Sequence, residues 1–166
     1  MGWTSSRPAP SSSTGQQESN RYHIRQEGPG SRNVRRPAAC HPEAMALRCL
    51  IVDDSPRFLE AARGLLEREG IVVVAVATNG ADAVRRAVEL GPDVTLVDID
   101  LGGQSGFDVV RRLTREADLA PSAVILVSTH AEEDYADLIA ASPVAGFLPK
   151  TRLSAGAIRD LLGLPA

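Results

Sequence analysis

Five polar side chains stand at the ends of apolar runs, and their types suit phosphoryl chemistry. They are Asp53, Asp54, Asp98, Ser128 and Lys150. Each run is typical of a strand buried on both faces, and the carboxyl ends of parallel strands share one rim of a sheet. A carboxylate at such a strand end is costly to desolvate, so it needs a metal, a cation or a reaction. We therefore predict a polar site at this rim, with Asp98 at its centre.

These residue types together can form and hold an acyl phosphate. Three neighbouring carboxylates cannot all stay ionised without compensation, and Mg²⁺, a hard cation that prefers oxygen ligands, provides it. Lys150 adds a compact ammonium group and is the only lysine among eighteen basic residues. Ser128 adds a hydroxyl that can donate to a phosphoryl oxygen. We expect Asp98 to act as the nucleophile while the other groups neutralise and orient the phosphoryl group.

Alternating strands and helices must position these residues. Strands are predicted over 47–52, 71–77, 94–98, 123–128 and 144–148, and helices over 56–69, 81–90, 107–116, 132–141 and 154–162. Parallel strands need right-handed helical crossovers, which place helices on both faces of the sheet. The prediction is an α/β three-layer (αβα) sandwich with a doubly wound, five-stranded parallel sheet.

Short local signals mark several boundaries of these elements. Ser55 and Ser154 are predicted N-caps, because their hydroxyls can accept from the first turn of a helix. Asn79-Gly80 is predicted as a turn, and Leu101 to Gly106, with three glycines, as a loop. Helical spacing places Val88 on the buried face of the second helix.

Charge is divided unevenly along the chain. Residues 1–46 carry six Arg and three Glu, whereas residues 47–166 carry twelve basic and eighteen acidic side chains. We predict that residues 1–45 form a disordered tail, because they are rich in Ser, Pro, Gly and Arg, and that residues 46–166 form the folded domain. An alternative is that translation begins at Met45. An acidic domain binds nucleic acid poorly, so we expect no nucleic-acid partner.

Neither hydropathy nor cysteine spacing indicates a membrane, secreted or metal-thiolate protein. No apolar run approaches the roughly 20 residues that cross a bilayer, and no signal peptide opens the chain. We therefore expect no membrane contact and a cytoplasmic location. Cys40 and Cys49 have neither the spacing of metal ligands nor that of a disulfide framework, and Cys49 falls within a predicted buried strand.

The stretch from Leu47 to Leu162 resembles the receiver domain of two-component response regulators, such as the single-domain receivers of chemotaxis. The spacing fits that family, with 44 positions from Asp54 to Asp98, 30 from Asp98 to Ser128 and 22 from Ser128 to Lys150. The motifs that carry the resemblance are Leu50-Ile51-Val52-Asp53-Asp54-Ser55, Leu96-Val97-Asp98, Ser105-Gly106-Phe107-Asp108, Val127-Ser128-Thr129 and Gly146-Phe147-Leu148-Pro149-Lys150.

The resemblance implies a flavodoxin-like fold with strand order 2-1-3-4-5, and it implies a role for each residue of the site. Asp98 would accept a phosphoryl group from a histidine kinase or a phosphotransfer protein. Mg²⁺ would be held by Asp53, Asp54, Asp98 and the backbone carbonyl of Asp100, and the phosphoryl oxygens would be contacted by Ser128 and Lys150. Phe147 would be the switch aromatic, and Asp100 and His130 occupy positions at which the family tunes dephosphorylation.

The family also implies how the signal leaves the domain. Its output surface corresponds to residues 132–162, through which we expect a downstream protein target and homodimerisation. Only four residues follow Leu162, so we expect a stand-alone receiver or phosphorelay intermediate that is not a turnover enzyme; loss of an output domain is the alternative. The chain departs from the family at Thr151, where many members have proline, and at Phe147, which lacks the phenol of tyrosine.

Other interpretations stand beside this one. Asp98-Ile99-Asp100 matches the Asp-x-Asp of haloacid-dehalogenase-like phosphatases, which also form an aspartyl phosphate; those enzymes place this motif after the first strand. A non-phosphorylated scaffold with the same fold is a third class. Asp53-Asp54 can be a helix-start acid pair, Phe147 a core aromatic, and His130 an exposed loop residue.

Overall fold

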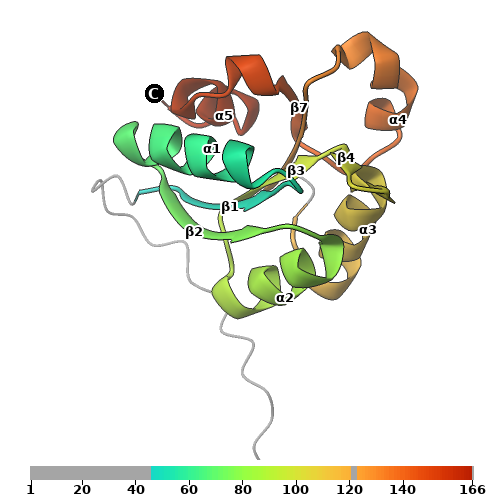
Figure 1. The fold of residues 1–166 in the computed structure, drawn as a ribbon, viewed down its shortest axis with the longest axis horizontal. Coiled ribbons are helices and arrows are strands. Elements are labelled where there is room, and N and C mark those ends of the chain that lie inside the picture. Colours follow the sequence, from blue (N-terminus) through green and yellow to red (C-terminus); the bar gives the residue numbers. More distant parts are fainter. Residues whose placement is uncertain (1–45, 121–122, 166) are drawn as a thin grey trace, which may run out of the picture. The chain divides into compact units, whose positions relative to one another are not determined.

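A five-stranded parallel sheet forms the middle layer of the domain (Figure 1). The structure is a computed structural model that describes residues 46–120 and 123–165, so the predicted tail over residues 1–45 lies outside the described residues. The sheet order is β2-β1-β3-β6-β7, which confirms the predicted order 2-1-3-4-5. The strands are β1 (Arg48–Val52), β2 (Val72–Ala77), β3 (Val94–Asp98), β6 (Val124–Ser128) and β7 (Gly146–Pro149).

Burial follows the place of each strand in the sheet. All residues of β3 and β6 are buried, because each strand has a neighbour on both sides and helices on both faces. The edge strand β2 alternates, with Val73 buried and Val72 exposed. The continuous apolar runs of β3 and β6 therefore carry Asp98 and Ser128 to the same buried rim.

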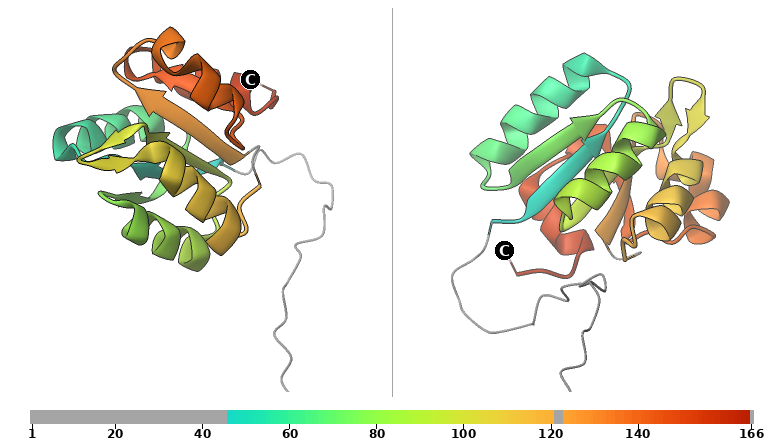
Figure 2. Two further views of the ribbon diagram at one scale, coloured as in Figure 1. Left: turned by 90° about the vertical axis from the view of Figure 1, so that its right-hand side faces the viewer. Right: turned by 90° about the horizontal axis from the view of Figure 1, so that it is seen from below.

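Helices cover both faces of the sheet, as two further views show (Figure 2). On one face, α1 (Pro56–Arg68) and α5 (Ala155–Leu161) enclose a core cluster that includes strand residues of β1, β3 and β6. On the other face, α2 (Gly80–Leu90) and α3 (Gly106–Glu116) enclose a second cluster. The predicted three-layer αβα sandwich is confirmed.

Side-chain caps set the starts of three helices. Ser55 Oγ accepts the N–H of Phe58 in α1 (3.3 Å), and Ser154 Oγ accepts a first-turn N–H of α5 (3.1 Å), which confirms both predicted N-caps. The prediction of a turn at Asn79-Gly80 is wrong. Asn79 Oδ1 accepts the N–H of Asp82 (2.9 Å), so Asn79 is the N-cap of α2 and Gly80 is the first residue of that helix.

The predicted loop from Leu101 to Gly106 contains a short hairpin. Within it, β4 (Asp100–Leu101) pairs antiparallel with β5 (Gln104–Ser105). Gly102-Gly103 forms the turn, with φ values of 53° and 96° that glycine adopts without strain. Strands of two residues are too short to show an alternating pattern, so no sequence pattern predicts this pairing.

Two helical predictions are wrong in detail. The helix expected over 132–141 is a 3₁₀-helix, η2 (Glu132–Tyr135), followed by a short α4 (Ala136–Ala140). No residue of either segment is buried, so packing stabilises a regular α-helix only weakly there. Val88 is 61% exposed, because it lies beyond the edge of the α2 stripe that buries Ala83 and Ala87.

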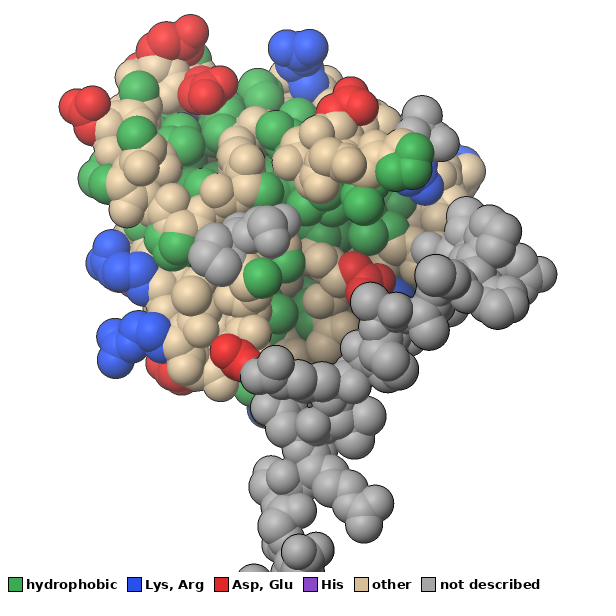
Figure 3. Space-filling view, turned by 180° about the vertical axis from the view of Figure 1, so that it is seen from behind, with side chains coloured by type: hydrophobic (Ala, Val, Ile, Leu, Met, Phe, Trp, Pro, Cys, Tyr) green, Lys and Arg blue, Asp and Glu red, His purple; other side chains and the backbone are tan. Residues whose placement is uncertain are grey.

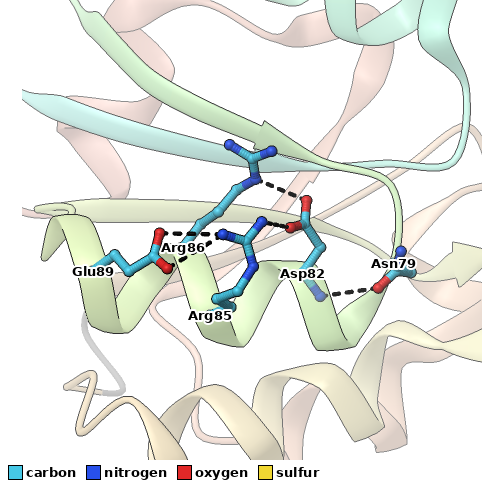
Figure 4. Close-up of polar contacts among 5 residues, drawn as sticks. All are labelled: Asn79, Asp82, Arg85, Arg86 and Glu89. Carbon is cyan, nitrogen blue, oxygen red and sulfur yellow. Dashed lines mark hydrogen bonds and ion pairs between the residues drawn. The ribbon is translucent and has the colours of Figure 1, made fainter.

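The surface of the described domain mixes charged and apolar groups. The view from behind shows most of the acidic and basic side chains near the margins, around an area where hydrophobic side chains alternate with uncharged and backbone atoms (Figure 3). On α2, Asp82 pairs with Arg85 and Arg86, and Arg85 also pairs with Glu89, all one turn apart on the same helix (Figure 4). Over residues 46–120 and 123–165, no helix has the length and hydropathy needed to span a membrane.

Candidate functional site

The predicted polar residues meet at the carboxyl ends of the strands. Asp53 follows β1 and is fully buried, Asp98 ends β3 and is 4% exposed, and the exposed Asp54 lies beside them. One carboxylate oxygen from each of these three residues lies within 4.8 Å of the others. The structure thus brings together the acid cluster that the sequence predicted, with one member open to water.

Lys150 joins two of these carboxylates. Its Nζ lies 2.6 Å from Asp53 Oδ2 as an ion pair and donates a hydrogen bond to Asp98 Oδ2 at 2.9 Å. The other oxygen of Asp53, Oδ1, accepts the N–H of Ser55 at 2.8 Å. In the part of the chain that the structure describes, every other ion pair lies within a single helix. Lys150 is therefore the cation that holds β1, β3 and β7 together at the rim.

Burial and charge shift two pKa values at this site. Burial raises the pKa of Asp98, the hydrogen bond from Lys150 opposes that rise, and the charge of Asp53 adds to it. For Lys150, burial disfavours the ammonium form, but the two carboxylates outweigh burial and raise its pKa above the ordinary value. The ammonium is thus held in its charged form, whereas Asp98 binds a proton more readily than an ordinary aspartate.

Two glycines allow the backbone to fold closely around the acid cluster. The N–H of Gly106 donates to the carbonyl of Ile99 (2.8 Å), and a Cβ on Gly106 would lie 2.1 Å from the backbone oxygen of Asp98. At Gly102, where φ is 53°, a Cβ would lie 2.9 Å from Asp54 Oδ2. Sequence reasoning missed both positions as site residues, although the glycines after Asp98 were a visible signal.

A side chain of the hairpin is anchored to a neighbouring helix. Gln104 Oε1 accepts the N–H of Gly80, the first residue of α2, at 2.9 Å. This N–H is one of the helix-start donors that have no partner within their own helix. The hydrogen bond therefore ties the segment that follows Asp98 to the start of α2.

The remaining predicted residues lie at or near the same rim. Ser128 is buried at the end of β6, next to β3, and its Oγ accepts the N–H of His130 at 3.0 Å. The His130 side chain is exposed, and its ring stands edge-on to Tyr135 with 6.2 Å between centroids. Phe147 is buried and belongs to the core cluster on the same face of the sheet as α2 and α3, and Asp100 is exposed on β4.

This arrangement is suited to phosphoryl chemistry at one carboxylate. Clustered carboxylate oxygens are the ligands that hard divalent cations prefer, so Asp53, Asp54 and Asp98 form a fitting metal site. Lys150 already contacts Asp98, where it can neutralise charge that a phosphoryl group would bring. A carboxylate that can act as a nucleophile, three residues that could hold a metal ion and a fixed cation therefore lie at one rim.

Comparison with known proteins shows one family. The family model described as response regulator receiver domain matches residues 49–160. Protein PilH of Pseudomonas aeruginosa is 42% identical over 86 residues, which are 52% of this chain and 70% of PilH. The chain spans half or less of the length of several other curated relatives.

Solved structures give the same result. The response regulator domain of Thermotoga maritima CheB has a TM-score of 0.60 and 26% identity, over 73% of this chain and 99% of that chain. A response regulator protein from Burkholderia pseudomallei, described with a phosphorylated aspartic acid and a calcium ion, has a TM-score of 0.60 and 25% identity. That match covers 69% of this chain and 66% of the Burkholderia chain.

Proposed function

Because the chain belongs to the response regulator receiver domain family, we propose that it accepts a phosphoryl group on Asp98 and relays it as a signal. The observation that carries this proposal is the contact of a buried Asp98 carboxylate with Lys150, beside Asp53 and Asp54. The phosphorylated aspartic acid described for the Burkholderia relative is consistent with it.

The proposed reaction moves one phosphoryl group from a phosphohistidine to Asp98. A carboxylate oxygen of Asp98 attacks phosphorus, forming a P–O bond, while the P–N bond to the donor imidazole breaks. The imidazole leaves with that electron pair and takes up a proton, and Asp98 becomes an acyl phosphate. Lys150, 2.9 Å from Asp98 Oδ2, would then contact an oxygen of the transferred group.

We propose Mg²⁺ as the metal ion of the acid cluster. Asp53, Asp54 and Asp98 would be its side-chain ligands, and the backbone carbonyl of Asp100 a further ligand. When bound, Mg²⁺ would neutralise charge on the phosphoryl oxygens as they approach the carboxylates. The exposure of Asp54 leaves the cluster open to an ion and a donor.

We assign the other residues to the conformational change that follows phosphorylation and to the lifetime of the phosphoryl group. Ser128 would turn its hydroxyl from its present contact with the His130 N–H toward a phosphoryl oxygen. Phe147, buried two strand positions before Pro149, would follow that movement by repacking. Asp100 and His130 are exposed beside the site and would affect the slow loss of the phosphoryl group to water.

The proposal extends to partners and location. The donor would be a histidine kinase or a phosphotransfer protein that meets the domain in the cytoplasm. The face formed by residues 132–162 would bind a downstream protein. The same face would also bind a second copy of the chain. The complete lack of buried residues in η2 and α4 leaves that stretch accessible for such contacts.

Intact mass after incubation with an acyl-phosphate donor and Mg²⁺ tests this function. We expect a gain of about 80 Da, the mass of one phosphoryl group. Asp98→Asn should abolish the gain, and Asp100→Asn, two positions along, should retain it. Absence of any gain with acyl-phosphate or phosphohistidine donors would refute the proposal, and rapid turnover of small phosphate esters would favour a phosphatase.

A further inference from the structure

Lys150 has a third neighbour besides the two carboxylates. Its Nζ lies 4.5 Å from the ring centroid of Phe58, within the range of an attractive cation–π contact. Phe58 is the third residue of α1 and is partly buried. Lys150 and Phe58 are 92 positions apart in the sequence, so the contact depends on the tertiary fold, which brings the start of α1 close to the residue that follows β7.

The same turn of chain positions Phe58 and the acid cluster. Ser55 donates its N–H to Asp53 Oδ1 (2.8 Å), and its Oγ accepts the N–H of Phe58 (3.3 Å). The N-cap of α1 is therefore linked to a carboxylate on one side and to the aromatic residue on the other. This linkage fixes the ring at a defined place beside the rim.

The ring differs from the carboxylates in one chemical respect. A metal ion at the acid cluster competes with Lys150 for Asp53 and Asp98, because all three carboxylates offer oxygen ligands to it. The face of a benzene ring attracts an ammonium through its quadrupole and is no ligand for Mg²⁺. Of the three contacts of Lys150, the one with Phe58 is therefore the contact for which a metal ion does not compete.

We propose that Phe58 is a positioning residue whose ring face holds the Lys150 ammonium beside Asp98 while a metal ion occupies the acid cluster. This inference rests on the proposed phosphoryl transfer to Asp98. It assigns a task to a residue of α1 that is neither a proposed metal ligand nor a proposed contact of the phosphoryl group. It also explains why the only lysine of the chain lies against an aromatic side chain.

The proposal predicts opposite effects on metal binding and on phosphoryl transfer. In Phe58→Leu the ammonium can withdraw toward water when Mg²⁺ arrives, which relieves repulsion between the two cations. Mg²⁺ affinity should then stay equal or rise, while the rate of phosphorylation by an acyl-phosphate donor should fall about two- to thirty-fold, the range of a cation–π contact. A variant that merely disturbed the acid cluster would lower both the Mg²⁺ affinity and the phosphorylation rate.

The single lysine allows the contact to be observed directly. With ¹³C-labelled lysine, the chain gives one set of side-chain signals, and nuclei over a ring face are shifted upfield by its ring current. We expect upfield-shifted Lys150 Cε protons in the wild type at constant pH, with and without Mg²⁺. The shift should be lost in Phe58→Leu and retained in Phe58→Tyr, which keeps the ring.

Matched variants decide the outcome. Phe58→Tyr should be phosphorylated at a rate close to that of the wild type. Pentafluorophenylalanine has the reversed quadrupole, so at position 58 it should lower the rate as leucine does. Wild-type rates in Phe58→Leu, or equal rates with phenylalanine and its fluorinated form, would overturn the proposal. If no donor phosphorylates the wild type, the proposed function fails, but loss of the Lys150 shift when Mg²⁺ is added would separately refute the positioning role.

Discussion

Replacing Lys150 with methionine tests how the rim is stabilised. Lys150→Met keeps a side chain of similar length. It removes the ammonium group, whose nitrogen lies 2.6 Å from Asp53 Oδ2 and 2.9 Å from Asp98 Oδ2. Asp53 is fully buried and Asp98 is 4% exposed, so water replaces the lost partner only poorly at either carboxylate. The variant therefore leaves two buried negative charges next to each other.

The cost follows from the burial of both partners. Removing one side of a buried ion pair typically lowers the free energy of unfolding by about 3–5 kcal/mol. We expect a loss near the lower limit, about 3 kcal/mol at pH 7, because the exposed Asp54 admits water to one side of the cluster. The loss should shrink as the pH falls, since Asp98, whose pKa is already raised, takes up a proton first.

The wild type should show the complementary pH dependence. The pKa of Lys150 is raised above its ordinary value of 10.5 in the folded state. Its contribution to stability is therefore fully present below that ordinary value and is lost as the pH rises through the higher folded-state pKa. In Lys150→Met this alkaline loss should be absent.

Urea unfolding followed by circular dichroism measures these differences. Mg²⁺ should stabilise Lys150→Met more than the wild type, because the ion replaces the missing positive charge and binds the folded state. Arg152→Met removes an exposed cation two positions away and should change stability by no more than about 0.5 kcal/mol. If Lys150→Met unfolds within about 1 kcal/mol of the wild type without Mg²⁺, the electrostatic account of the rim is wrong.

Three further predictions concern residues of the core and the rim. Asp98→Asn should raise the urea midpoint at pH 7, because the raised pKa of Asp98 makes its ionised form costly, and the gain should vanish in acid. Gly106→Ala should lower stability by about 3 kcal/mol in urea unfolding, whereas Gly156→Ala, which has open space, should not destabilise. In a Cys40→Ser background, Cys49, with its pKa raised to about 12, should resist iodoacetamide until urea unfolds the protein, as mass spectrometry would show.

The parts of the fold that sequence reasoning predicted are those with strong local patterns. The runs ending in Asp98 and Ser128 are long enough and apolar enough to mark buried strands, and the structure buries every residue in them. Ser55 and Ser154 were recognisable as N-caps because each precedes a helical pattern. The meeting of the strand-end residues followed from the geometry of parallel sheets alone.

The parts that sequence reasoning missed depend on contacts between distant segments or on weak packing. The ring of Phe58 fits the apolar pattern of α1 equally well as a core residue, and only the folded chain places it 4.5 Å from Lys150. Residues 132–141 have the spacing of a helix but bury no side chain, so the first turn is a 3₁₀-helix. Asparagine favours turns and N-caps alike, so the residue type of Asn79 does not distinguish between the two.

The hydrogen bond from the Gly80 N–H to Gln104 has a consequence for exchange kinetics. The first amide of a helix ordinarily faces water and exchanges its proton rapidly, because no carbonyl within the helix accepts it. Here the accepting oxygen belongs to Gln104, in the hairpin that follows Asp98. Gln104 lies 24 positions after Gly80 in the sequence. Exchange at Gly80 therefore requires that the hairpin move away from α2. The exchange rate of this single amide therefore measures how often the hairpin after Asp98 separates from α2. The measurement needs neither a label nor a substitution in the protein.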